Sequence, residues 1–346
     1  MHKYQFYISF KDKIHTAASK AIQDCNHILA SSGYQDFTVN TALTTDKRYL
    51  YGILKNILKL FFFVKPKSII AVQYPLLSGN ALFKYFIKAL RIKKVKFFCI
   101  IHDLDELRYK EDLLIGKEAE NLNYYDCIIV HNEIMQNWLL KRGVTTPMIP
   151  LQMFDYLTDK KDQDTCHLVP NQNYKKVVFA GNLTKSSFIY SLDILSDWCF
   201  NLYGPNFSHE KGDGIKNLHW NGSFSPAEII TRMEGAFGLI WDGEYIDRLD
   251  DKYGNYLKYN NPHKLSLYLA AGLPVIAPTD SAVSKFIREH NLGILVNNLL
   301  ELKDMAIDDF QYNVFKTNVL AVSKRIKKGE YSTAAIRRAE NILEVI

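Results

Sequence analysis

Lys264 stands where a protein could hold an anion. It belongs to the segment NPHKLSLYLAAGLPVIAP, residues 261–278, which predicts a buried helix over 262–271 and a short interior strand over 274–277. Asn261 is a good N-cap, and the helix dipole disfavours a cation in the first turn after it. A lysine at this place indicates an anion bound at the start of the helix, with a solvent-facing lysine as the alternative.

Polar side chains also follow several predicted strands. The run FAGNLTKS, residues 179–186, places Gly181 directly after a strand, where backbone N–H groups can approach an anion, with Lys185 nearby. Asp242 follows the strand run FGLIW in the same way. Ligands of open parallel sheets bind at the carboxyl ends of strands. An ordinary turn explains one such exit, but several exits together with Lys264 indicate a phosphate-bearing nucleotide.

A histidine and several acids follow another strand run, FFCII, in the first half of the chain. His102 and Asp103 come first, and Asp105 and Glu106 follow. Such residues can act as a general base, or they can close a loop and cap the next helix, which we expect of Asp105 and Glu106. The run DLD at 103–105 also matches a pattern that holds a divalent cation on a diphosphate, but D-x-D is a weak signal and we expect no metal.

Composition and missing motifs exclude several classes of protein. The chain has no G-x-G-x-x-G, no P-loop and no H-E-x-x-H, so a dinucleotide cofactor, a standard NTPase and a zinc protease are disfavoured. Its five cysteines are scattered and never form C-x-x-C, which indicates a reducing cytoplasm. A hydrophobic content of 47% and a charged content of 23% are typical of a soluble globular protein. The opening residues MHKYQFYISF resemble a strand and not a secretory signal.

The elements that must position these residues alternate along the chain. Strand-like runs such as SIIAVQY, VKFFCII and KVVFA alternate with helical patterns, which predicts an α/β protein of parallel sheets covered by helices. A helix is expected at 225–234 and a strand at 236–241. The polar stretch 152–175 predicts a linker between two doubly wound domains, and residues 309–346 predict two final helices.

The net charge of +6 is unevenly distributed. Residues 47–102 contain no Asp or Glu, and two stretches within them, KRYLYGILKNILKLFFFVKPK and ALFKYFIKALRIKKVK, interleave cations with Phe, Tyr, Leu and Ile. Cationic amphipathic helices rich in aromatic residues are typical of membrane-surface contacts. A solvated helix face is one alternative, and a nucleic-acid surface, which we expect least, is another.

Five segments resemble a family of bacterial glycosyltransferases in order and spacing. They are IHDLDELR (101–108), FDY (154–156), FAGNLTKSSFIY (179–190), FGLIWDGE (237–244) and YGNYLKYNNPHKLSLYLAAGLPV (253–275). The most similar members are β-1,6-galactofuranosyltransferases of polysaccharide assembly. A glucosyltransferase that extends the glycans of streptococcal serine-rich adhesins is more remote.

The resemblance implies the GT-B fold, in which two Rossmann-like doubly wound domains face a cleft. The acceptor would lie mainly on the N-terminal domain and the donor nucleotide in the C-terminal one. We expect the first domain at 1–152 and the second at 153–320, with helices at 321–346 packing back on the first domain.

The resemblance also implies a UDP-sugar donor, no required metal or cofactor, and particular site residues. Lys185 and Lys264 match the basic residues that meet the diphosphate, although relatives have Arg in place of Lys185, and a lysine loses the bidentate fork. Phe224 stands where relatives have a nucleotide-contacting Tyr, so stacking on uracil is kept and a hydroxyl contact is lost. The remaining candidates are Gly181, Asn182, Asp242, Asn261, His263 and Tyr268 on the donor side and Ser19, Lys20 and Asp24 on the acceptor side.

Transfer from UDP-α-galactofuranose to a β-linked product would invert the anomeric carbon. A base must then take the acceptor's proton from the face opposite UDP, and Asp103 and His102 are the candidates. The acceptor would be a glycan or a lipid-linked oligosaccharide at the cytoplasmic face of the inner membrane. Two alternatives stay open: a UDP-glucose or UDP-galactose pyranosyltransferase of the same fold, and a non-catalytic module that binds glycan or nucleotide. A homo-oligomer is compatible with either.

Overall fold

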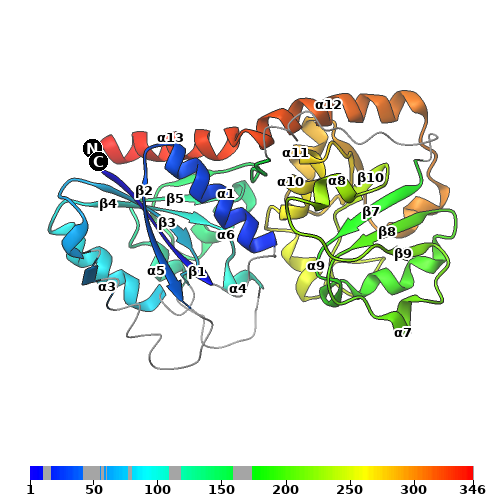
Figure 1. Ribbon diagram of the computed structural model, residues 1–346, viewed down its shortest axis with the longest axis horizontal. Coiled ribbons are helices and arrows are strands. Elements are labelled where there is room, and N and C mark those ends of the chain that lie inside the picture. The colour runs from blue at the N-terminus through cyan, green and yellow to red at the C-terminus, as the bar shows by residue number, and fades with distance from the viewer. Residues whose placement is uncertain are drawn as a thin grey trace. The chain divides into compact units, whose positions relative to one another are not determined.

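The alternation of strands and helices expected from the sequence is present in the computed structural model, which confirms an α/β protein (Figure 1). The structure describes residues 1–10, 17–41, 55, 58–59, 61–76, 80–108, 118–158 and 174–345, without the side chains of 7–10, 17–19, 37–41 and 80–82. Contacts between Cα atoms divide the chain into unit 1, Met1–Met153 with Tyr331–Ile346, and unit 2, Phe154–Glu330. The expected linker 152–175 lies largely outside the described residues.

Unit 1 is built on a parallel six-stranded sheet. Its elements are β1 (Lys3–Phe10), α1 (Ala17–Ser31), β2 (Gln35–Thr41), β3 (Ile69–Tyr74), α3 (Asn80–Arg91), β4 (Lys96–Ile101), α4 (Asp105–Arg108), α5 (Glu118–Leu122), β5 (Cys127–Val130), α6 (Glu133–Lys141), β6 (Met148–Pro150) and α13 (Glu330–Val345). The strand order is β2-β1-β3-β4-β5-β6, so the direction of winding switches between β1 and β3.

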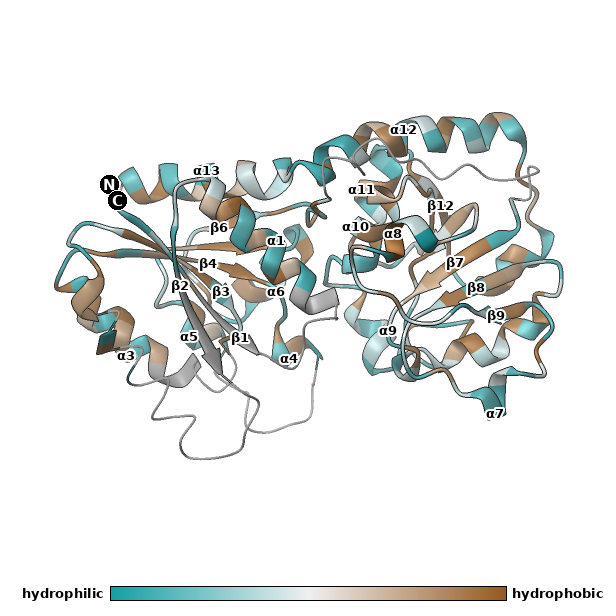
Figure 2. Ribbon diagram, viewed as in Figure 1, coloured by the Kyte–Doolittle hydropathy of each residue, from teal (hydrophilic) through white to brown (hydrophobic). Residues whose placement is uncertain are grey.

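The strands of unit 1 read as continuous apolar runs because helices cover both faces of a parallel sheet. All residues of β3 and β5 are buried, and Figure 2 shows the apolar colouring of β4 beside them. The end of the chain closes this unit: Glu340 of α13 lies 2.8 Å from Lys3 and accepts a hydrogen bond from the Tyr34 hydroxyl. Residues 331–346 therefore belong to unit 1, whereas 321–330 of the expected final segment belong to unit 2.

Unit 2 repeats the architecture, with a second parallel six-stranded sheet. Its elements are β7 (Lys176–Ala180), η4 (Leu183–Lys185), η5 (Ser187–Ile194), β8 (Cys199–Tyr203), α7 (His209–Gly212), β9 (Leu218–Trp220), α8 (Ile229–Arg232), β10 (Phe237–Leu239), α9 (Lys252–Tyr256), α10 (His263–Ala270), β11 (Val275–Pro278), α11 (Ser284–Glu289), β12 (Gly293–Val296), η6 (Leu299–Asp304) and α12 (Asp309–Lys327). The strand order β12-β11-β10-β7-β8-β9 switches between β7 and β10. Crevices at such switch points are where open α/β sheets bind ligands.

Three local expectations are corrected. The helix expected from residue 262 begins at His263, because Pro262 has an extended backbone (φ −67°, ψ 132°) and is itself the N-cap, while Asn261 is buried before it. The helix expected at 225–234 is reduced to α8, since Ser225 and Glu228 bond to each other in a turn. The strand expected at 236–241 ends at Leu239, before the carbonyl of Trp241 is taken by Lys264.

The described residues include no helix that is both long enough and apolar enough to cross a membrane.

Candidate functional site

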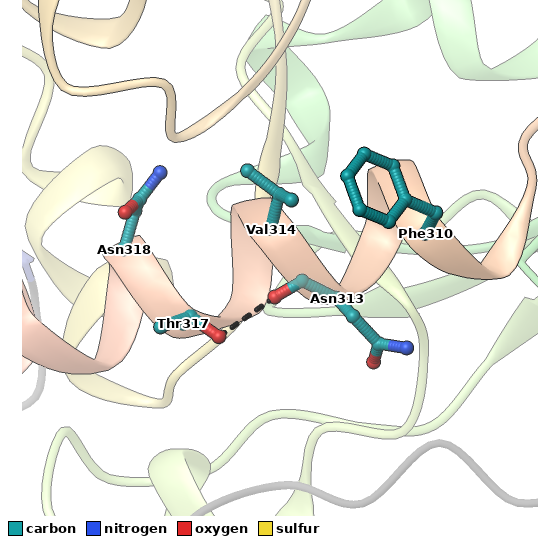
Figure 3. A pocket seen from close by; sticks show the side chains of 5 residues that line it. All are labelled: Phe310, Asn313, Val314, Thr317 and Asn318. Atoms are coloured by element: carbon teal, nitrogen blue, oxygen red, sulfur yellow. Dashed lines mark hydrogen bonds between the residues drawn. The ribbon is translucent and has the colours of Figure 1, made fainter.

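A shallow hollow on the surface of α12 is not suited to an anionic ligand. It is lined by Phe310, Asn313, Val314, Thr317 and Asn318 of this one helix, and the Thr317 hydroxyl donates to the Asn313 carbonyl (Figure 3). None of these side chains is charged. The chemistry expected from the sequence lies instead at the exits of β7 and β10.

Lys264 is held at the switch point of unit 2 by groups from the exit of β10. Its Nζ lies 2.6 Å from Oδ1 of Asp242 and donates to the Trp241 carbonyl at 3.0 Å. The same nitrogen lies 4.2 Å from the ring centroid of Phe179, the penultimate residue of β7. The Lys264 side chain is 14% exposed and that of Asp242 23%, so the pair is enclosed but reachable.

Burial determines the electrostatics of this lysine. Desolvation lowers the pKa of Lys264 below that of an ordinary lysine, while the charge and hydrogen bond of Asp242 oppose the shift. Gly181 supplies the space, because a Cβ at that position would lie only 2.9 Å from Lys264 Cε. The glycine after β7 thus lets the stem of Lys264 pass close to the backbone.

The backbone of Lys185 lies in the same region, at the exit of β7. It ends η4, which Asn182 caps by accepting from the Thr184 amide, and its carbonyl accepts from the Gly243 amide at 3.2 Å. The next residue, Ser186, donates its hydroxyl to Asp242 Oδ1 at 2.9 Å. Asp242 therefore joins the two lysine-bearing segments.

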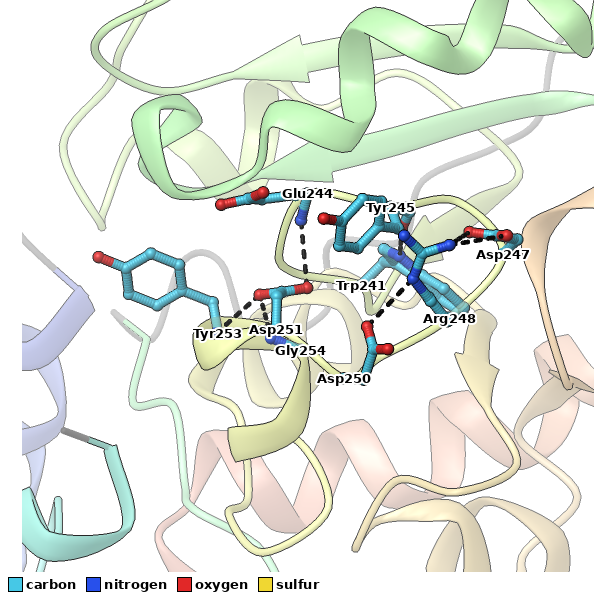
Figure 4. A network of polar contacts seen from close by, with 9 residues as sticks. All are labelled: Trp241, Glu244, Tyr245, Asp247, Arg248, Asp250, Asp251, Tyr253 and Gly254. Atoms are coloured by element: carbon cyan, nitrogen blue, oxygen red, sulfur yellow. Dashed lines mark hydrogen bonds and ion pairs between the residues drawn. The ribbon is translucent and has the colours of Figure 1, made fainter. Parts of the chain in front are cut away.

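The loop after β10 adds residues that the sequence analysis missed (Figure 4). Asp251 caps α9 by accepting from the amides of Tyr253 and Gly254, and it also accepts from the Glu244 amide. The Tyr253 ring lies 5.6 Å from Lys185 Nζ. The signal was present as an Asp directly before the short helical run KYGNY, which is an N-cap pattern. Lys185, whose ammonium group lies beside the Tyr253 ring, is far away in sequence, so no local pattern joins these two residues.

Contacts of Arg248 hold the same loop in place. Arg248 lies 3.2 Å from both Asp247 and Asp250, and its guanidinium lies 3.6 Å from the Tyr245 ring centroid. The Tyr245 carbonyl in turn accepts from the indole of Trp241 at 2.8 Å. These contacts fix the chain that leaves β10, and with it the position of Asp242.

The other predicted donor residues fall into two groups. Phe224 is half-buried beside Tyr203, at 6.3 Å between ring centroids, and Asn182 is exposed. His263 is half-buried, with its ring 5.3 Å from that of Tyr156. Tyr268 belongs to the core: it is fully buried and its hydroxyl accepts from the Ala180 amide at 2.8 Å. Asn261 is likewise buried, at 4% exposure.

In unit 1, His102 leaves β4 and is held by a glutamine that the sequence analysis missed. Its Nε2 lies 2.7 Å from Oε1 of Gln73, whose amide donates to Asn26 Oδ1 and to the Ile22 carbonyl of α1. Because the amide nitrogen of Gln73 donates to α1, its oxygen faces His102 and accepts a hydrogen bond, so Nε2 of His102 carries the proton. His102 Nδ1 is buried. His131, at the exit of β5, is buried as well, and burial lowers its pKa to about 4.

The neighbouring acids differ in their surroundings. Asp103 pairs with Arg108 at 3.0 Å, and its side chain is 29% exposed. Asp105 has its pKa raised by burial and by the charge of Asp103. Glu106 and Glu118 bond reciprocally, each carboxylate accepting from the other residue's amide. Glu106 thus has the structural role expected of it.

The acceptor-side candidates lie on α1. Lys20 Nζ is 2.5 Å from Oδ1 of Asp24, and both side chains are largely buried. The side chain of Ser19 lies outside the described residues. Because Gln73 joins α1 to His102, the structure brings this ion pair and the exit of β4 to one end of unit 1.

Within the described part of the chain, no group of three His, Cys, Asp or Glu side chains is placed to hold a metal ion. The two acids of the D-x-D run have different surroundings: Asp103 pairs with Arg108, and Asp105 is the first residue of α4.

Comparison with known proteins shows relatives along most of the chain. Residues 5–153 match the family model of the glucosyltransferase 3-like N-terminal domain, and residues 177–339 match that of the C-terminal domain. The chain is 34% identical to the β-1,6-galactofuranosyltransferase WbbI of Escherichia coli over 70% of each chain. It is 27% identical to glucosyltransferase 3 of Streptococcus gordonii over 81% of this chain and 80% of that protein.

Solved structures show the same fold at low identity. A trehalose-phosphate synthase (UDP-forming) from Burkholderia vietnamiensis has a TM-score of 0.60 at 11% identity and covers all of both chains. TarM of S. aureus, solved with UDP, has a TM-score of 0.52 at 15% identity over 83% of this chain and 58% of its own. The two doubly wound units are those of the GT-B fold, which confirms the expected fold class. The chain is a glycosyltransferase that belongs to the glucosyltransferase 3-like family.

Proposed function

We propose that the protein transfers galactofuranose from UDP-galactofuranose to a glycan acceptor, with inversion and without a metal ion. The observation that carries the proposal is the enclosed Lys264 at the switch point of unit 2, beside Gly181 and Asp242. A buried ammonium group next to a glycine turn suits a diphosphate leaving group. The identity to a galactofuranosyltransferase supports this choice of sugar.

Lys264 and Lys185 are the proposed ligands of the diphosphate. In the absence of a metal, cationic side chains must neutralise the charge that develops as UDP leaves. Asp242 holds the Lys264 ammonium group in place, and Tyr253 lies beside the Lys185 ammonium group. Phe224 and Asn182 are proposed for the nucleoside side of the same pocket.

Asp103 is the proposed general base, in preference to His102. The Nε2 of His102 bonds to Gln73 and its Nδ1 is buried, whereas the carboxylate of Asp103 is partly exposed. Arg108 pairs with the carboxylate of Asp103 at 3.0 Å and orients it. Lys20 and Asp24 are proposed to contact the acceptor.

A second donor, UDP-glucose, is supported by the names of the matched family and of the streptococcal relative. We therefore propose a direct comparison of UDP-galactofuranose, UDP-galactose and UDP-glucose with simple glycoside acceptors, with products read by mass spectrometry. The galactofuranose donor is expected to give the largest yield. UDP-glucose as the best donor would replace the proposed sugar, and donor binding without product from any donor would indicate a non-catalytic module.

The product's anomeric configuration tests inversion separately. A solved trehalose-6-phosphate synthase with a TM-score of 0.54 transfers with retention, so the fold alone does not imply inversion. Proton NMR of the product should show a β-linkage from the α-donor, and an α-linkage would exclude Asp103 as the inverting base. We also propose that the reaction takes place in the cytoplasm, which the free cysteines support.

A further inference from the structure

We propose that unit 1 binds the surface of an anionic lipid bilayer through a patch of exposed apolar and cationic side chains. We call it the Phe62 surface. It consists of the exposed residues Phe62, Phe63, Lys65, Lys67, Tyr85, Lys88, Ile92 and Lys94, with the half-buried Lys84 beside Tyr85.

Large apolar side chains of this surface are exposed to an unusual degree. Phe62 is 80% exposed, Phe63 72% and Ile92 84%. Single exposed apolar residues are common on proteins and need no explanation, but neighbouring ones mark interaction sites.

Contacts around Lys93 show that these residues are neighbours. Lys93 Nζ donates to the carbonyls of Phe61 and Val64, at 2.6 Å and 3.3 Å, and lies 4.7 Å from the Phe61 ring centroid. The Lys67 amide also donates to the Lys93 carbonyl. The segment that carries Phe62 is thereby fastened to the turn that follows α3, where Ile92 lies.

The helix α3 continues the surface with its outer face. Its inner positions Phe83, Phe86 and Leu90 are buried. The outer positions Tyr85 and Lys88 lie on a different face, three residues apart, and Ile92 follows seven residues after Tyr85. An aromatic ring, a lysine and an aliphatic side chain therefore point away from the core together.

The charge of the surface has one sign. Residues 47–102 contain no Asp or Glu. Among the residues that the structure describes, Arg91 is the cation of this region that has an acidic partner, Asp126 at 3.4 Å. The lysines thus present uncompensated positive charge around the apolar side chains. This combination fits an anionic bilayer, since lipid headgroups pair with the lysines while Phe62, Phe63 and Ile92 enter the acyl boundary. An RNA would gain from the rings but nothing from Ile92.

Flotation with lipid vesicles tests this inference. The full-length protein should float with vesicles of phosphatidylglycerol and phosphatidylcholine and remain behind with phosphatidylcholine alone. The Lys88→Gln/Lys94→Gln variant should lower the partition coefficient about 30-fold, because each lysine near an anionic surface contributes about fivefold. The Phe62→Ser/Phe63→Ser variant should lower it by at least about tenfold.

Matched controls come from unit 2. Phe310 is as exposed as Phe62, at 80%, so Phe310→Ser removes an equally exposed ring, and Lys303→Gln/Lys324→Gln removes two exposed lysines. Both controls should float like the wild type. Three results would each overturn the inference. They are unchanged flotation of the Phe62 surface variants, equal binding of the wild type to neutral and anionic vesicles, and tighter binding to an RNA oligonucleotide than to vesicles.

Folding and activity are measured in parallel. Variants of exposed residues should keep the thermal unfolding midpoint of the wild type and its turnover of a soluble acceptor. Vesicle binding needs neither donor nor acceptor, so it stands or falls independently of the proposed reaction.

Discussion

The ammonium nitrogen of Lys264, in the first turn of α10, lies 2.6 Å from a carboxylate oxygen of Asp242 at the exit of the neighbouring strand β10. The helix dipole disfavours a cation at this place, and the acid offsets that cost. Desolvation nevertheless lowers the pKa of Lys264, with Asp242 opposing the shift. The ammonium form therefore depends on Asp242.

UDP affinity is expected to depend on pH through Lys264. The protonated form binds the diphosphate, and because burial lowers the pKa of Lys264, UDP affinity should be lost as pH rises, at a lower pH than an ordinary lysine would give. Asp242→Asn should shift this loss to lower pH. Calorimetric titrations with UDP across the alkaline range measure both effects. The Lys264→Arg variant, which stays charged, separates this titration from that of UDP itself, and identical profiles for it and the wild type would contradict the assignment.

Replacement of the two candidate bases should have different effects. Asp103→Asn removes the proton acceptor and should lower kcat by about 100-fold or more, while UDP affinity is kept. His102→Asn should act more weakly, because His102 is held by Gln73 behind the strand exit. Steady-state UDP release measures both variants. A larger loss of kcat in His102→Asn would assign the base to the histidine.

Gly238 is expected to be required for stability. A Cβ at this position would lie 2.2 Å from the Tyr268 ring, and that ring is held by the bond between its hydroxyl and the Ala180 amide. Gly238→Ala should lower the free energy of unfolding by about 1–3 kcal/mol. Gly214→Ala is the matched control, since nothing lies within 4 Å of a Cβ there. Equal urea midpoints for both variants would show that the ring can move aside.

Much of the fold could be predicted because the strands are buried on both faces. Runs such as IIAVQY of β3 and KVVFA of β7 leave little ambiguity about a parallel sheet. Short elements were less predictable: β6 has three residues, and α8 has four where a longer helix was expected. Their lengths depend on turns and contacts rather than on periodicity.

The candidate site could be predicted only to the level of strand exits. Glycine and lysine after a strand identify Gly181 and Lys185, and the position of Lys264 in its helix marks it as unusual. That Asp242 stabilises this lysine follows from the packing of α10 beside β10, which no local pattern reveals. Tyr268, which the resemblance placed on the donor side, is buried in the core, where its hydroxyl accepts from the Ala180 amide.

The central claim is that Lys185 and Lys264 hold one diphosphate, and calorimetry with UDP and with uridine tests it most directly. Lys185→Ala and Lys264→Ala should each weaken UDP binding about 10- to 100-fold, as expected for a hydrogen bond to a charged group. Uridine affinity should not change, and Lys252→Ala, an exposed lysine beside Tyr253, should leave both affinities intact. Unchanged UDP affinity in the two lysine variants, or an equal loss for uridine, would contradict the claim.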